Sequence, residues 1–185
     1  MTDVASIADR NQSQLVVVDM QTKLSSVMTE HIASVVKHCA ILLQGASLLE
    51  IPTLFTEQYP KGLGTTLPEL SSYMAGNKAI EKTAFSCCRE PAFSRHLLRD
   101  HCQVVLVGME AHICILQTAL DLLAQGKTVF VVEDAVVSRH PENKRNALNR
   151  MRGAGVIITN TESLLFEWLG VAEGDTFKKI SQLVR

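Results

Sequence analysis

The stretch VVLVGMEAHICILQTALDLLAQG, residues 104–126, decides the fold class. Its first four residues are apolar and mostly β-branched, a pattern typical of a buried parallel strand. Residues 113–125 then have the spacing of an amphipathic helix, and Gly126 follows where a helix-ending glycine is expected. The stretch therefore predicts a strand that leads into a helix, which is the building unit of an α/β fold.

The same alternation of strands and helices recurs along the chain. Apolar runs predict further strands at residues 15–18, 52–55, 79–82, 128–132 and 156–159. Amphipathic stretches predict helices at residues 31–50, 91–100, 141–152 and 161–169, with Pro91 and Pro141 at helix starts and Gly153 at a helix end. Because crossovers between parallel strands are right-handed, this order predicts a three-layer α/β/α domain with a mostly parallel, doubly wound, six-stranded sheet.

Composition limits the classes of protein to consider. The 185 residues are 46% hydrophobic and 20% charged, enough for one sizeable core, so we expect a single domain over residues 1–185 with its core at about 15–169. The formal net charge of -1, without a basic stripe, argues against a nucleic-acid partner. The sequence has no signal peptide and no apolar run of about 20 residues, so no membrane partner is expected. Five cysteines without a secretory signal favour a reduced, cytoplasmic protein.

Several predicted strands are followed by residues that can carry chemistry. Ligands of a doubly wound sheet bind outside the carboxyl ends of its strands, where the strand order reverses. Asp19 follows the first strand, Lys82 ends the short strand, and Cys114 lies six residues past Gly108, near a helix start. If the order reverses between the strands at 15–18 and 104–107, Asp19 and Cys114 face one another across the crevice. Thr56 and Glu133 are expected at two further strand ends.

The chemistry of these three side chains is coherent. A helix N-terminus and the Lys82 ammonium would both lower the pKa of the Cys114 thiol and favour a nucleophilic thiolate. Asp19 could take the thiol proton, and backbone N–H groups at the helix start could stabilise an oxyanion. This set fits acyl-type hydrolysis through a thioester. Each residue also has a structural alternative: Asp19 as a turn residue, Lys82 as a solvated charge, Cys114 as a small buried side chain.

The words around these positions carry a resemblance to a known family. VVVDMQ (residues 16–21), EKTAFS (81–86) and GMEAHICILQTALDLLAQG (108–126) resemble, in order and separation, the three signature segments of the isochorismatase-like cysteine hydrolases. VVEDAVVSR (131–139) and MRGAGVIITNTES (151–163) are also similar to that family, so the likeness covers about residues 15–169.

The resemblance implies a fold and a set of functional residues. The fold is a Rossmann-like α/β/α domain, and the catalytic triad of the family corresponds to Asp19, Lys82 and Cys114. A cis peptide bond that does not involve proline is implied at Met109–Glu110. With it, the backbone N–H groups of Glu110 and Cys114 become the expected oxyanion hole. Many members of the family are oligomers, so a homo-oligomer is expected.

One stretch departs from the pattern of the nicotinamidases, which are relatives that hold a metal through an Asp-x-His element and further histidines. Here the corresponding residues 56–64 read TEQYPKGLG, and the chain has no histidine between His38 and His96. We therefore expect no catalytic metal and no cofactor. The words EQYPKGLG (57–64) and GMEAHIC (108–114) resemble instead the subgroup described as isochorismatase domain-containing proteins.

The long loop at residues 57–78 and its neighbours are expected to form the pocket. Substrate-binding residues are predicted at Gln21, Tyr59, Phe85 and His112, although Phe85 could belong to the core and His112 could cap its helix. Cys87 and Cys88 are adjacent and lack the C-x-x-C spacing of a redox motif, which makes a thiol switch a minor alternative.

These observations predict a metal-independent cysteine hydrolase that acts on a small amide, carbamoyl or related C–N substrate. Two alternatives from other classes stay open. The first is a catalytically weak binding or scaffolding protein that retains the fold, and the second is a thiol-reactive redox protein.

Overall fold

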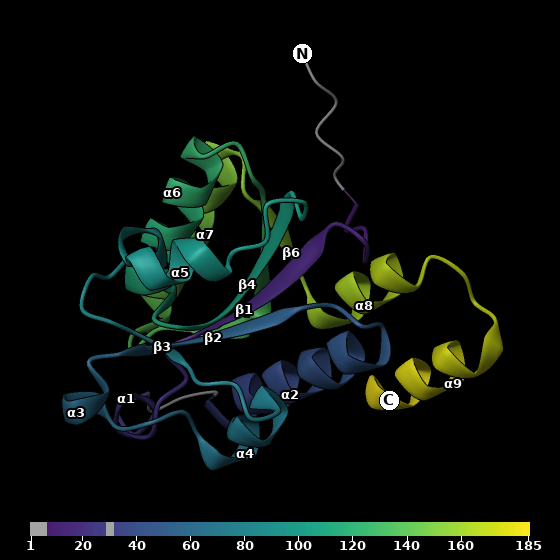
Figure 1. Ribbon diagram of the computed structural model, residues 1–185, viewed down its shortest axis with the longest axis horizontal. Coiled ribbons are helices and arrows are strands. Elements are labelled where there is room, and N and C mark those ends of the chain that lie inside the picture. The colour runs from purple at the N-terminus through teal and green to yellow at the C-terminus, as the bar shows by residue number, and fades with distance from the viewer. Residues whose placement is uncertain (1–6, 29–31) are drawn as a thin grey trace.

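The computed structural model describes residues 7–28 and 32–185, and its centre is a single parallel sheet (Figure 1). Within these residues six strands are ordered β3-β2-β1-β4-β5-β6, and each neighbouring pair is parallel. The strands are β1 (Ser13–Val18), β2 (Thr53–Gln58), β3 (Ile80–Lys82), β4 (Gln103–Met109), β5 (Thr128–Val137) and β6 (Ile157–Thr159). The predicted fold class is confirmed, and the strand order reverses between β1 and β4.

Helices cover both faces of the sheet (Figure 1). The longer ones are α2 (Ile32–Leu48), α5 (Pro91–His96), α6 (Leu116–Ala124), α7 (Pro141–Ala154), α8 (Thr161–Leu169) and α9 (Gly174–Leu183). The short ones are α1 (Thr22–Ser25), α3 (Pro60–Leu63), α4 (Pro68–Ser71), η1 (Ser72–Met74), η2 (Cys87–Arg89) and the π-helical turn η3 (Ala111–Ile115). None of the helices in residues 7–28 and 32–185 has the length and apolar character needed to cross a membrane.

Two hydrophobic cores lie on opposite faces of the sheet. Successive side chains of a strand point to opposite faces, and β1 divides accordingly. Leu15 and Val17 pack in one core with α2 and α8, whereas Val16 and Val18 pack in the other with α6 and α7. β1 is therefore buried on both sides, as the strand pattern predicted.

Some predicted boundaries are wrong. β5 does not end at Glu133 but continues to Val137, because the register of β4 and β5 shifts between Leu106 and Gly108. Ser138 and Arg139 therefore reach the carboxyl edge of the sheet, and Glu133 does not. α7 continues past Gly153 to Ala154 and ends at Gly155, whose φ of 101° is the left-handed helix-ending conformation.

Other elements start, end or extend differently from the prediction. The helix predicted at 113–125 begins at Ala111, as η3, before it continues as α6. α5 ends at His96, and the long loop at 57–78 contains three short helical turns. α9 places Ile180 in the hydrophobic core, which therefore extends past the expected residues 15–169. Residue 31 of the first predicted helix lies outside the described residues.

The carboxyl ends of β1 and β4 lie side by side, with Val18 aligned with Gly108. Gly108 has a φ of 117°, and a Cβ atom there would overlap the carbonyl oxygen of Val18. A side chain at this position would push apart the two strands at the strand reversal. Position 108 therefore requires glycine, because β1 and β4 lie too close together there for a side chain.

We predict that Gly108→Ala lowers the free energy of unfolding by more than about 3 kcal/mol, because the added methyl group meets backbone and the φ is unfavourable. Gly153→Ala is the matched control, since a Cβ there meets no atom within 4 Å and the position is helical. The control variant should gain about 0.5–1 kcal/mol. Urea denaturation measures both, and equal stability of the two variants would contradict the prediction.

Candidate active site

The structure brings Asp19, Lys82 and Cys114 together at the carboxyl edge of the sheet. The Nζ atom of Lys82 lies 2.7 Å from Oδ2 of Asp19 and 3.6 Å from Sγ of Cys114. The side chains of Lys82 and Asp19 are 0% exposed, and Cys114 is 5% exposed. A carboxylate, an ammonium and a thiol thus share one buried cluster at the strand reversal.

Lys82 is held by oxygen acceptors in addition to Asp19. Its ammonium donates to Oε1 of Gln58 at 2.6 Å and to the carbonyl oxygens of Phe85 at 3.1 Å and Ala84 at 3.3 Å. Burial acts to lower the pKa of Lys82. The negative charge of Asp19 and the thiol of Cys114 act in the opposite direction and together outweigh burial, so the pKa is raised overall. The side chain therefore stays a cation in the interior.

Asp19 leaves β1 with a φ of 53°, which is uncommon for a residue other than glycine. Its backbone N–H donates to the carbonyl of Thr56 at 3.1 Å, and the hydroxyl of Thr56 donates to Oδ1 at 2.7 Å. These contacts hold the carboxylate so that Oδ2 faces Lys82.

The surroundings of Cys114 favour the protonated thiol. Burial raises the pKa of Cys114, the negative charge of Asp19 and a hydrogen bond to that carboxylate raise it further, and the nearby Lys82 lowers it only in part. The expectation that a helix N-terminus and Lys82 would produce a resting thiolate is therefore wrong. The thiol proton is instead directed toward a carboxylate that can accept it.

A second buried thiol lies beside the cluster. Sγ of Cys87 is 3.9 Å from the Thr56 hydroxyl, and the Cys87 amide donates to Oγ1 of Thr118 at 3.0 Å. Burial raises the pKa of Cys87 to about 11 and that of Cys88 to about 12, and both cysteines are free. Cys87 packs against Thr56, which supports Asp19, and the sequence pattern alone did not show this contact.

Gln21, predicted to bind substrate, is fully buried. Its amide nitrogen donates to the carbonyls of Gln58 at 3.0 Å and Gly64 at 2.6 Å, and its oxygen accepts from the amide of Gln58 at 2.7 Å. Gln21 thus fixes the backbone of Gln58, whose side chain holds Lys82. Gln58 was not predicted as a site residue, although it belongs to the EQYPKGLG segment that the resemblance singled out.

Tyr59 and Phe85 are exposed, by 56% and 54%. Phe85 is therefore not a core residue. Tyr59 lines a cavity of about 290 Å³ with neighbours that include Pro60, Lys82 and Thr83. A larger cavity of about 630 Å³ runs along Pro52–Phe55 and is lined by none of the predicted site residues.

His112, predicted to bind substrate, is part of a polar network. Its Nδ1 lies 2.9 Å from the hydroxyl of Ser138, and the side-chain amide of Asn143 donates to Nε2 at 3.4 Å. Ser138 and Asn143 were not predicted as site residues, because their place depends on the extension of β5 to Val137.

The turn that carries Cys114 starts directly after β4. The Met109–Glu110 peptide bond is cis, and Glu110 is the N-cap residue of η3 without a side-chain cap hydrogen bond. The first N–H groups of a helix have no acceptor within the helix. Within residues 7–28 and 32–185 there is no group of three or more His, Cys, Asp or Glu side chains placed to hold a metal ion.

Comparison with known proteins identifies the family of the chain. Residues 13–163 match the family described as Isochorismatase domain. The chain is 42% identical over 173 residues to isochorismatase domain-containing protein 2 of Danio rerio, covering 93% of this chain and 86% of that protein. A structure described as MAR1 ribonuclease from Caenorhabditis elegans has a TM-score of 0.88 and 38% identity, covering 96% of this chain and 92% of that one. The YcaC product of Escherichia coli, described as an octameric hydrolase of unknown specificity, shares the fold, with a TM-score of 0.90 and 21% identity over 98% of this chain and 92% of that one. The chain therefore belongs to the isochorismatase family of hydrolases.

Proposed function

We propose that the protein is a metal-independent cysteine hydrolase that acts on a small amide, carbamoyl or related C–N substrate. The observation that carries this proposal is the buried cluster in which Lys82 lies 2.7 Å from Asp19 and 3.6 Å from Cys114. A nucleophile, a base and a fixed positive charge are thereby within reach of one another. Membership of a hydrolase family supports the same reaction class.

In the first half of the reaction, Sγ of Cys114 attacks the substrate carbonyl carbon while Asp19 takes the thiol proton. Because the resting thiol is protonated, this proton transfer accompanies the attack. The carbonyl electrons move to oxygen, and the resulting oxyanion accepts hydrogen bonds from the backbone N–H groups of Glu110 and Cys114. Lys82 stays charged and stabilises the developing negative charge on sulfur.

In the second half, the tetrahedral adduct collapses and the C–N bond breaks. Asp19 returns the proton to the leaving nitrogen, and a thioester to Cys114 remains. Water then attacks the thioester with Asp19 as its base. The acid product leaves, the proton returns to sulfur, and the resting thiol is restored.

The exposed rings of Tyr59 and Phe85 are proposed to contact the substrate. Gln21 and His112 are proposed to support the site without touching the substrate, because their polar atoms already bond to protein groups. We also propose that the chain forms a homo-oligomer in the cytoplasm. The exposure of Tyr59 and Phe85, each more than half exposed beside the cluster, supports the substrate contact. The five free thiols support a location in the reducing cytoplasm. Sedimentation equilibrium should show a species larger than the 20.3 kDa chain, and a monomer at all concentrations would contradict the assembly.

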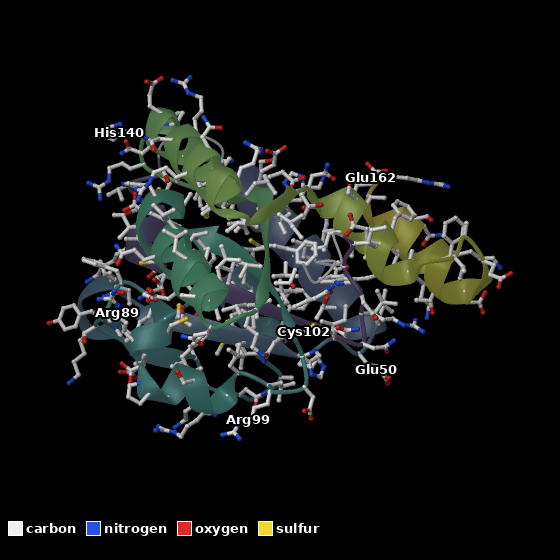
Figure 2. The ribbon with its side chains drawn as sticks, turned by 90° about the horizontal axis from the view of Figure 1, so that it is seen from above. Glu50, Arg89, Arg99, Cys102, His140 and Glu162 are labelled. Carbon is white, nitrogen blue, oxygen red and sulfur yellow. The ribbon has the colours of Figure 1, made fainter. Side chains whose placement is uncertain are left out.

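We predict that iodoacetamide labels Cys114 at alkaline pH, because the pKa of this thiol is raised. Cys114→Ala should abolish turnover of small amides, because the variant has no nucleophile. Cys102→Ala is the control, since Cys102 is exposed and precedes β4 at the amino edge of the sheet. The site lies at the opposite, carboxyl edge, which His140 after β5 marks in Figure 2, well apart from Cys102. Labelling is measured by peptide mass spectrometry and turnover by ammonia release.

The same panel separates the other candidate functions. If the total label per chain and the rate of ammonia release are the same in Cys114→Ala and in the wild type, the assignment of the nucleophile is overturned. Labelling of Cys114 without turnover of any amide favours the binding protein. Because the Caenorhabditis elegans relative is described as a ribonuclease, a short RNA belongs in the panel, and cleavage of RNA but no amide would replace the proposed substrate class.

We predict that Asp19→Asn lowers the pH midpoint for alkylation of Cys114, because the negative charge of Asp19 raises the pKa of that thiol. Turnover should fall by about 10²–10⁴-fold, since the general base is lost. Asp121→Asn is the control, because Asp121 raises the pKa of Cys88 and pairs with Arg89 on the surface. A midpoint that rises or stays constant in Asp19→Asn would show that Asp19 does not act on the thiol.

A further inference from the structure

The Glu110 carboxylate has an unexpected set of partners. Its side chain is only 6% exposed and belongs to the N-cap residue of η3, yet it makes no cap hydrogen bond to the helix. The carboxylate instead accepts from the backbone N–H of Arg139 at 3.2 Å and pairs with the Arg139 guanidinium at 3.5 Å. A buried acid at a helix N-terminus is thus turned toward the end of β5.

The imidazole of His112 is held by the same region. Nδ1 of the ring lies 2.9 Å from the hydroxyl of Ser138, and Nε2 lies 3.4 Å from the side-chain amide nitrogen of Asn143. Oε2 of Glu110 lies 3.9 Å from Nδ1 of His112. Groups that follow β5 and begin α7 therefore fix two side chains in the turn that carries Cys114.

This arrangement runs against an ordinary preference. A carboxylate at a helix N-cap is stabilised by bonding to the first N–H groups and by the helix dipole. In that position Glu110 would compete with a developing oxyanion for the same N–H groups and would repel it. η3 continues without a break into α6, so these groups begin a helical segment from Ala111 to Ala124.

We propose that Arg139 is a positioning residue that holds the Glu110 carboxylate away from the first turn of the Cys114 helix and so leaves its N–H groups free for the oxyanion. This inference rests on the proposed function, which assigns those groups to the oxyanion. Arg139 acts through Glu110 and need not touch the substrate.

Two probes of similar size and different charge test the proposal. Iodoacetate is an anion and iodoacetamide is neutral, and both alkylate the same thiol, so the ratio of their rates at Cys114 cancels changes in thiol ionisation. In Arg139→Ala the Glu110 carboxylate keeps the backbone N–H of residue 139 but loses the guanidinium, so it can turn toward the first turn of the helix and should lower the iodoacetate-to-iodoacetamide ratio by about fivefold. Glu110→Gln alone should change the ratio by less than about twofold, because the carboxylate it removes is already turned away and paired. The double variant Arg139→Ala/Glu110→Gln should return to within about twofold of the wild type.

A plain loss of positive charge gives a different result. If the two charges act independently, Glu110→Gln raises the ratio by the same factor in both backgrounds, and the proposal is overturned. Arg145→Ala is the control for charge, because Arg145 lies on the exposed face of α7 and pairs with Glu142. Thermal melting of each variant excludes unfolding as the cause.

Outcomes for the inference and for the proposed function can be told apart. If Cys114 reacts with iodoacetamide but Arg139→Ala keeps the wild-type ratio, only the role of Arg139 fails. If neither reagent labels Cys114 in the wild type, the nucleophile assignment fails first. For any amide that is turned over, Arg139→Ala should lower kcat with KM nearly constant, and Arg139→Lys should recover part of the loss.

Discussion

The ion pair between Lys82 and Asp19 is the constraint on which the rest of the structure depends. Both side chains are fully buried, and the two charged atoms are 2.7 Å apart. Moving an ion into a protein interior costs several kcal/mol, which the attraction of a partner offsets only when further hydrogen bonds are supplied. Here Gln58 and two backbone carbonyls supply them to the lysine, and Thr56 supplies one to the aspartate.

Hydrogen bonds between the loops at the carboxyl edge of the sheet hold this ion pair in place. Gln21 binds the backbone of Gln58, so the acceptor of Lys82 is itself fixed by a buried amide. Thr118 in α6 binds the amide of Cys87, which joins the loop after β3 to the helix that carries Cys114. A site built from three strand ends is in this way held by short hydrogen bonds between loops that are distant in the sequence.

The sequence predicted the centre of the sheet well because β1 and β4 are buried on both faces and therefore appear in the sequence as continuous apolar runs. It also selected Asp19, Lys82 and Cys114, since each follows or ends such a strand or begins a helix. The predicted fifth strand ended too early because the apolar run 128–132 is followed by Glu133 and Asp134. The register shift that keeps these two residues in β5 depends on its pairing with β4. The ionisation of Cys114 could not be predicted, because it depends on burial and on the nearness of Asp19, both of which are tertiary properties. Gln58 was missed because its role depends on its distance from Lys82, a residue 24 positions away.

The division of β1 between two cores has a consequence for folding. Leu15 and Val17 belong to one core and Val16 and Val18 to the other, while Asp19 follows directly. A slip of one residue in the pairing of β1 would exchange the two sets of side chains, place each in a core shaped for the other, and carry Asp19 away from Lys82. Misaligned chains would thus lose both cores and the reactive centre in the same event.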